Sequence, residues 1–113
     1  MDAAKRHFTS LGYVVEDHSK NHPYDLRCIK KEERLYVEVK ATQTNGEGVF
    51  LTSGEVEFAR QHNGQMALFL LHSIKVSDNK KVLTNGQTHV ILPWDVDRGC
   101  LKAVSYQYDV PGR

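Results

Sequence analysis

The sequence has few of the residues that hold a domain together covalently and none of the segments that carry a chain across a membrane. Its two cysteines, Cys28 and Cys100, are too few for a disulfide framework and lack the C-x-x-C spacing of a metal site. No apolar run approaches the roughly 20 residues of a membrane span, and the N-terminus has no signal-peptide pattern. We therefore expect an intracellular, cytoplasmic domain with reduced thiols.

An excess of charge of either sign is also missing. Lys and Arg total 15 and Asp and Glu total 14, which gives a formal net charge of +1. Non-specific DNA-binding domains usually have a clear basic excess. If this chain touches DNA, either its basic residues gather on one face or a companion domain supplies the affinity. The sequence also lacks a Ser-His-Asp triad spacing, a P-loop and a Gly-rich dinucleotide motif.

The length allows one hydrophobic core and not two. The chain has 113 residues, of which 40% are hydrophobic and 26% are charged, an ordinary composition for a globular domain. A helical pattern begins already at residue 2. We therefore expect residues 1–113 to form a single domain, excised from a longer multidomain protein.

The first half of the chain predicts one helix followed by three strands. Apolar side chains recur at helical spacing in residues 2–11, with Ala4, Phe8 and Leu11 on the inner face and Gly12 as the stop. The strands are expected at residues 13–17, 24–30 and 34–42, with a charged turn at 31–33 between the last two.

The second half predicts one more helix and further strands. Thr52 and Glu55 form a T-x-x-E capping box at the start of a helix that runs to about residue 62. The apolar run from Met66 predicts a central strand that is buried on both faces. Two strands at 82–84 and 88–92 are expected around an Asn85-Gly86 turn signal, and 101–110 alternates weakly as a last edge strand or a tail. This order predicts an α/β fold with one mixed sheet and extra C-terminal strands.

Three polar side chains of the second and third strands could carry chemistry. Alternation places Tyr36, Glu38, Lys40 and Thr42 on the face of strand 34–42 opposite to Leu35, Val37, Val39 and Ala41. The hairpin pairs Asp25 with either Glu38 or Lys40, and directly opposed residues have Cβ atoms roughly 4.5–5.5 Å apart. In either register all three side chains lie on the non-core face.

This arrangement suits a divalent metal bound to a phosphodiester. Asp25 and Glu38 could share one cation, with the carbonyl of Val39 as an extra ligand. Hard oxygen ligands with open positions favour Mg²⁺ or Mn²⁺. Lys40 would then position or deprotonate a water molecule and offset charge in the transition state. The alternative is a solvated sheet face with an Asp25–Lys40 ion pair, worth ~0–1 kcal/mol. Spacing alone leaves both interpretations open.

Other side chains have a functional and a structural interpretation. Glu55 could support the metal ligands or serve only as a cap, and Thr42 could bind phosphate or simply fit a strand. His18 and His22 could touch a DNA backbone or bind a metal, but lack a third ligand. The remaining candidates are Asp2 and Gln61 as supporting residues, and Lys20 and Arg27 as contacts to a DNA backbone.

The sequence resembles a known nuclease superfamily at these positions. Pro23-Tyr24-Asp25 and Glu38-Val39-Lys40 look like the PD-(D/E)XK motif, and the expected element order is that of the restriction-endonuclease-like fold. More narrowly, the chain is similar to the uncharacterised domain named after the C-terminal region of the protein NO VEIN, through residues 51–60 and 67–74 and loosely 91–95. The resemblance implies that Asp25 and Glu38 are metal ligands and that Lys40 is the catalytic lysine.

The resemblance also implies a function and an alternative. Many such nucleases add a glutamate from the first helix, where this chain offers only Asp2. We expect a Mg²⁺- or Mn²⁺-dependent DNA endonuclease, the effector domain of a restriction or other defence protein whose other domains select the target. A homodimer would supply the two sites of double-strand cleavage. The alternative is a catalytically inactive module that keeps the fold and binds nucleic acid or protein.

Overall fold

The computed structural model describes residues 1–84 and 86–113, and Asn85, the first residue of the expected Asn85-Gly86 turn, lies outside them. The elements are α1 (Asp2–Ser10), β1 (Val14–Asp17), β2 (Leu26–Lys30), β3 (Glu33–Ala41), α2 (Ser53–Gln61), β4 (Met66–His72), β5 (Lys75–Val76), β6 (Val82–Thr84), β7 (Gln87–Ile91) and the short 3₁₀ helix η1 (Val96–Arg98). The predicted α/β class with one main mixed sheet is confirmed.

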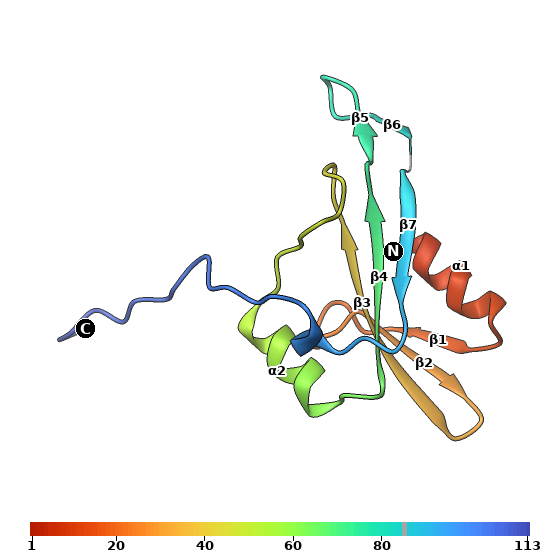
Figure 1. Ribbon diagram of the computed structural model, residues 1–113, viewed down its shortest axis with the longest axis horizontal. Helices are drawn as coiled ribbons and strands as arrows, with labels where there is room; N and C mark the ends of the chain where they lie inside the picture. Colours follow the sequence, from red (N-terminus) through yellow and green to blue (C-terminus); the bar gives the residue numbers. More distant parts are fainter. Residues whose placement is uncertain (85) are drawn as a thin grey trace.

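The main sheet has five strands in the order β1-β2-β3-β4-β7 (Figure 1). Among the strand pairs that the structure describes, only β3 and β4 run parallel. Helix α2 connects them as a crossover, because parallel neighbours cannot be joined by a tight turn. The first five residues of β4 are all buried, as the apolar run from Met66 predicts. A second, two-stranded sheet pairs β5 with β6.

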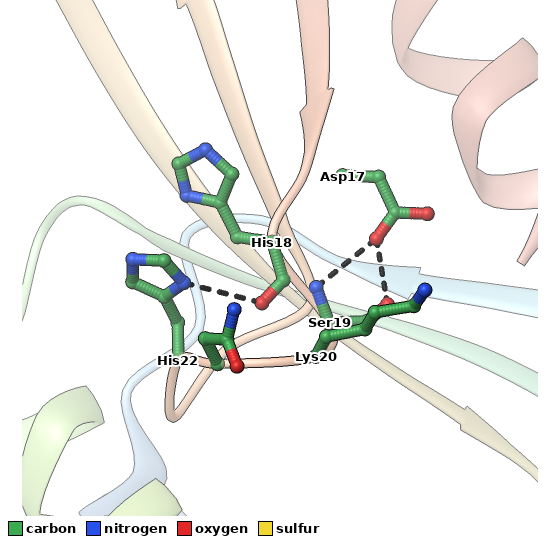
Figure 2. A pocket seen from close by; sticks show the side chains of 6 residues that line it. Asp17, His18, Ser19, Lys20 and His22 are labelled. Atoms are coloured by element: carbon green, nitrogen blue, oxygen red, sulfur yellow. Dashed lines mark hydrogen bonds between the residues drawn. The ribbon is translucent and has the colours of Figure 1, made fainter.

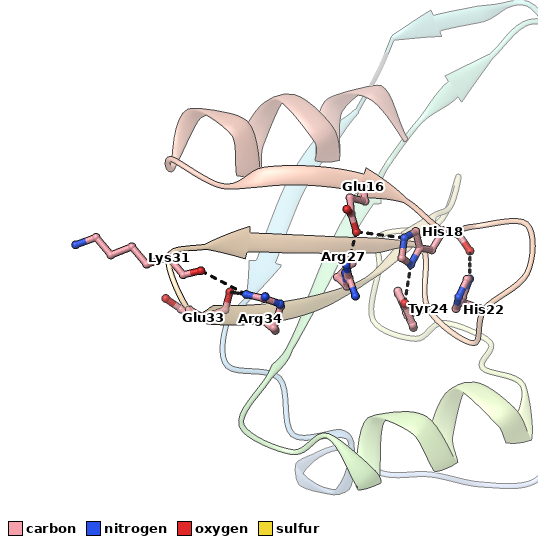
Figure 3. A network of polar contacts seen from close by, with 8 residues as sticks. All are labelled: Glu16, His18, His22, Tyr24, Arg27, Lys31, Glu33 and Arg34. Atoms are coloured by element: carbon pink, nitrogen blue, oxygen red, sulfur yellow. Dashed lines mark hydrogen bonds and ion pairs between the residues drawn. The ribbon is translucent and has the colours of Figure 1, made fainter.

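The two helices cover opposite faces of the main sheet, as the edge-on view of Figure 3 shows. On the α1 face, Ala4 and Phe8 pack against a row of apolar side chains that includes Leu35 and Val37 of β3. On the α2 face, Ala59 packs with Met66, Leu68, Trp94 and Val96, and Tyr36 of β3 joins them. The expectation that the second face of β3 lies outside the core is therefore wrong.

The inner face of α1 is shorter than predicted. Ala4 and Phe8 are fully buried, but Leu11 is 44% exposed. The helix ends at Ser10, and Gly12 follows with a φ of +93°, a conformation that favours glycine. Leu11 lies past the last helical residue and therefore does not continue the apolar face of α1. Its predicted place on that face is wrong.

The hairpin predicted between residues 82–84 and 88–92 does not form. Both strands exist, but β6 pairs with β5, and β7 pairs with β4 from Leu68↔Ile91 to His72↔Gln87. Gly86 has a φ of +73°, and a Cβ atom there would lie 2.1 Å from the carbonyl oxygen of His72. Gly86 therefore lies in a close crossing over the end of β4, and β7 pairs with more residues of β4 than the three-residue β6 could offer.

The C-terminal segment is a tail and not an edge strand, the two alternatives that its weak alternation left open. Residues 101–110 are exposed and contain neither helix nor strand, and they run away from the body of the domain as an extended arm (Figure 1). Among the described residues, no helix has both the length and the apolar character that crossing a membrane would need.

Candidate functional site

The register of β2 and β3 decides how the candidate residues meet. The ladder runs from Lys30↔Glu33 to Leu26↔Val37, so the turn is shorter than the predicted 31–33. One step further, the backbone N–H of Asp25 donates to the carbonyl of Val37 at 2.9 Å. This register places Asp25 opposite Glu38, which is one of the two registers predicted from the sequence.

The Asp25 carboxylate takes the place of a strand partner where β2 begins. Asp25 lies directly before Leu26, the first residue of β2, and its Oδ2 accepts a hydrogen bond from the backbone N–H of Val39 at 2.8 Å. The N–H and C=O groups of one strand residue point to the same side of the strand. The carbonyl of Val39 is therefore directed toward the side on which Asp25 lies, where the predicted extra ligand would have to be.

Glu38 is a buried carboxyl group, with only 2% of its surface exposed. Burial raises its pKa to about 9, and a hydrogen bond to Glu55 and the negative charges of Asp25 and Glu55 act in the same direction. The positive charge of Lys40 opposes these effects but does not outweigh them. Glu38 therefore keeps its proton at neutral pH unless further positive charge enters the cluster.

Lys40 joins the two glutamates. Its Nζ lies 3.1 and 3.3 Å from the two carboxylate oxygens of Glu55 and 3.5 Å from Oε1 of Glu38. The shorter distances to Glu55 agree with a protonated Glu38. No ion pair in the described part of the chain joins Lys40 to Asp25, and the predicted solvated face is contradicted by the burial of Glu38.

Glu55 has two roles, where the sequence left open whether it supports the metal ligands or serves only as a cap. It completes the predicted capping box: its N–H donates to Thr52 Oγ1 at 3.1 Å, and its Oε1 accepts from the N–H of Thr52 at 2.8 Å. Burial acts to raise the pKa of Glu55, but the Thr52 N–H, Glu38 and Lys40 together hold it below its usual value. The side chain is thus an ionised partner of Lys40 as well as a cap.

Three other candidates are engaged elsewhere. Asp2 is exposed at the start of α1, on the opposite face of the sheet. The hydroxyl of Thr42 lies 2.9 Å from that of Thr44 and accepts the Thr44 N–H in a turn. Gln61 is exposed and donates to Glu57 at 3.5 Å. The predicted metal ligands and lysine are brought together, and these three supporting candidates are not part of the cluster.

The loop before Asp25 forms a shallow hollow of its own (Figure 2). It is lined by Asp17, His18, Ser19, Lys20, Asn21 and His22. The rings of His18 and His22 stack with their centroids 4.5 Å apart. Lys20 is exposed, so its amine is accessible to a phosphate group.

A polar network ties this loop to the segment that carries Asp25 (Figure 3). Arg27 donates to Glu16 at 2.8 Å, and Glu16 lies 3.3 Å from Nε2 of His18. Nδ1 of His18 lies 2.6 Å from the hydroxyl of Tyr24, and the N–H of His18 donates to the carbonyl of Asp25 at 2.8 Å. Arg27, expected at a DNA backbone, is therefore already paired with a carboxylate.

The donor set of the cluster fits a hard divalent cation. Among the residues that the structure describes, no three His, Cys, Asp or Glu side chains gather closely enough to hold a metal ion. Asp25 and Glu38 would contribute two carboxylates, with the Val39 carbonyl as a third oxygen. Mg²⁺ is usually held by one or two carboxylates and keeps several waters. The low number of protein donors is therefore compatible with Mg²⁺ and argues against a closed structural site.

Comparison with known proteins identifies the family. The family described as Protein NO VEIN, C-terminal, matches residues 1–85, and the chain belongs to it. The matched range contains Asp25, Glu38, Lys40 and Glu55. The chain matches no curated protein and no solved structure.

Proposed function

We propose that the chain is a metal-dependent nuclease domain of the PD-(D/E)XK type, which hydrolyses phosphodiester bonds of DNA. One observation carries the proposal: a carboxyl group at 2% exposure lies close to two further carboxylates, and one lysine amine contacts both glutamates. Burying carboxyl groups in excess of their positive partners costs free energy. A divalent cation would offset that excess.

In this proposal Asp25, Glu38 and the carbonyl of Val39 hold the metal. A bound Mg²⁺ or Mn²⁺ supplies Lewis acidity toward the phosphate and lowers the pKa of a coordinated water. The hydrogen bond between Val39 N–H and Asp25 Oδ2 fixes one carboxylate oxygen and leaves the other free. Glu38 must give up its proton before it can serve as an ionised ligand.

Lys40 is the proposed catalytic lysine. Its amine hydrogen-bonds the attacking water and offsets negative charge on the phosphate. The water oxygen bonds to phosphorus, the bond from phosphorus to one ester oxygen breaks, the water loses a proton and the leaving oxygen gains one. The products are a phosphomonoester and an alcohol. At 22% exposure, the Lys40 side chain is shielded enough for its charge to act strongly, yet accessible from solvent.

The architecture supports the same proposal. The order α1-β1-β2-β3-α2-β4 is the order expected for the restriction-endonuclease-like fold, and the cluster lies beside β3 where β2 begins. The net charge of +1 suggests that other domains supply most of the DNA affinity and select the target, in a restriction or defence protein. Lys20 is the exposed candidate for a contact to the DNA backbone, and a homodimer would cut both strands.

Plasmid cleavage tests this function. The chain, expressed with its native flanking domains where these exist, is incubated with supercoiled plasmid and Mn²⁺ or Mg²⁺. We expect nicked or linear product that disappears with EDTA, in Asp25→Ala and in Lys40→Ala. Product that persists in both variants, or a wild-type protein that cuts neither DNA nor RNA with either metal, would contradict the proposal.

A non-catalytic interaction module is the second candidate. The near-neutral charge favours it, as does the position of Asp2, which is exposed on the face opposite to the cluster. In that case Lys40, Glu38 and Glu55 form a closed ion-pair cluster that needs no metal. This module would bind its nucleic acid or protein partner equally well in EDTA and in Mn²⁺, whereas a nuclease site would lose catalysis in EDTA.

A further inference from the structure

Glu55 belongs to a helix cap and to the polar cluster at the same time. As the third residue of α2, it accepts the N–H of Thr52 through Oε1. The same carboxylate receives the Lys40 Nζ at 3.1 and 3.3 Å. Each carboxylate oxygen accepts about two hydrogen bonds, so the cap does not exhaust the acceptor capacity of the group.

We propose that Glu55 is a positioning residue for Lys40, so that the first turn of α2 is part of the active site; this rests on the nuclease function proposed above. Lys40 has a flexible four-carbon stem and would otherwise sample several positions above the sheet. Glu55 binds its amine through both carboxylate oxygens, and Oε1 of Glu38 lies 3.5 Å from the same amine.

The location of the pair makes the contact stronger than an ordinary surface ion pair. The side chains of Lys40 and Glu55 are 22% and 18% exposed, so solvent screens their attraction only in part. Glu55 is also held charged by the N-terminal end of α2, where negative groups are favoured. The backbone N–H of Thr52 holds the Glu55 carboxylate in place, and Glu55 in turn holds Lys40.

The two glutamates therefore have separate tasks. Glu38 lies on β3 beside Asp25, where a metal would be held. Glu55 approaches from α2 and offers its negative charge to the lysine. A metal that bound Glu38 would take that carboxylate from Lys40, and Glu55 would then be the partner that keeps the amine in place.

Two variants separate positioning from capping. Glu55→Gln retains an oxygen for the Thr52 N–H, since glutamine also serves in a capping box, but it loses the charge that holds Lys40. Thr52→Ala removes the hydroxyl that receives the Glu55 N–H and leaves the Glu55 carboxylate facing Lys40. A purely capping role predicts that Glu55→Gln behaves like the wild type and that only Thr52→Ala weakens the protein. Thr52→Ser serves as the control that keeps the cap.

The first measurement follows Lys40 without requiring catalysis. In protein labelled with ¹³C-lysine, the two Hε protons of Lys40 are expected at separate chemical shifts, because the amine is held. We expect them to merge into one averaged resonance in Glu55→Gln and to stay separate in Thr52→Ala. Separate shifts that persist in Glu55→Gln would overturn the proposal.

The second measurement is cleavage of plasmid DNA by the same proteins. Misplacing a catalytic group by about 1 Å costs roughly 10²-fold in rate, and we expect a loss of that order in Glu55→Gln. Thr52→Ala should cut within about twofold of the wild type at a temperature where both are folded. Equal rates in Glu55→Gln and wild type would overturn the proposal, as would equal losses in the two variants. If the wild type itself never cuts, the nuclease function fails, and the Lys40 resonances alone decide the positioning role.

Discussion

The two faces of β3 come from one strand but carry opposite chemistry. Leu35 and Val37 point into the α1 face, in a core whose buried members are all apolar. The next residue, Glu38, is nearly as buried as Val37 but lies on the α2 face with Lys40 and Glu55. Burying a carboxyl group lowers the stability of the folded chain, whereas burying a methyl group raises it. We interpret the stability given up on the α2 face as the mark of a functional site.

The largest stability effect is expected on the α1 face. Phe8 is fully buried against Phe69 and Tyr13, so Phe8→Ala removes a large apolar side chain and leaves a cavity. Urea titration should show a loss of about 3–5 kcal/mol in the free energy of unfolding. Phe50→Ala is the matched control, because Phe50 is 78% exposed. A loss below about 1 kcal/mol in Phe8→Ala would mean that the α1 face is not a packed core.

On the α2 face, a substitution in the cluster should stabilise the metal-free protein. The pKa of Glu38 is about 9 in the folded chain against the ordinary 4.5. Below pH 4.5 both states are protonated; as the pH rises, the unfolded chain releases this proton and the folded chain retains it, so stability falls until about pH 9. Glu38→Gln does not titrate, and it should gain on the order of 2 kcal/mol over wild type at pH 8.

The pH series is the control for that prediction. Urea unfolding in EDTA at pH 4, 6 and 8 should show the two proteins converge at the lowest pH and separate as the pH rises. A difference that stays constant across the series, or a variant that is less stable at pH 8, would mean that Glu38 is ionised in the folded chain. In that case the burial of Glu38 on the α2 face would not destabilise the folded chain, and the contrast with the apolar α1 face would be wrong.

The helix cap is expected to have a smaller effect. Thr52→Ala removes the acceptor of the Glu55 N–H at the start of α2, and such losses cost about 1 kcal/mol. Thermal and urea unfolding would measure it, with Thr52→Ser as the conservative control. An unchanged stability would indicate that the Lys40 contact alone holds this end of α2 in place.

The two cysteines extend the comparison to reactivity. Burial raises the pKa of the Cys28 thiol to about 12, and Cys28 belongs to the α1-face core, whereas Cys100 is exposed. The thiolate is the reactive form, so a thiol reagent at pH 8 should label one cysteine in the native chain and two in urea. Mass spectrometry would identify the native label. Labelling of Cys28 at a rate near that of Cys100 would show that the α1 face opens readily.

The smallest effect is expected in the C-terminal arm. Tyr106 is 88% exposed and lies on a segment without helix or strand, so Tyr106→Ala should change the free energy of unfolding by less than about 0.5 kcal/mol. Tyr24→Ala is the contrasting variant, because Tyr24 is buried between Tyr36 and Phe58. A large loss in Tyr106→Ala would show that the arm packs against the domain in solution.

Much of this fold can be predicted because the signals are local. The capping box at Thr52 and Glu55, the apolar run from Met66 and the alternation around Glu38 each concern neighbouring residues. The alternation also limited Asp25 to two registers, and the structure selects the one that faces Glu38. Local patterning thus sufficed to place the three main candidate residues, Asp25, Glu38 and Lys40, on one face of the sheet.

The misses concern contacts between distant segments. Spacing cannot show that α2 lies over β3, so the pairing of Glu55 with Lys40 is visible only in the folded chain. The Asn85-Gly86 signal is a good local hairpin signal, yet β7 gains five residue pairs with β4. The alternation in residues 34–42 predicted one solvated face. That face is covered in part by Trp94 and Val96, which come much later in the chain, so the local pattern could not reveal its burial. Each miss reflects tertiary contacts that overrode a local pattern.

Calorimetric titration of Mn²⁺ into the metal-free protein tests the central claim most directly, with Glu38→Gln as the matched variant of nearly equal volume. We predict saturable binding by the wild type, with proton release visible as a dependence of the heat on the buffer, since Glu38 must ionise to bind a metal. Binding and proton release should both disappear in Glu38→Gln. Identical heats in the two proteins, or no binding by either, would contradict a metal-dependent site at Asp25 and Glu38.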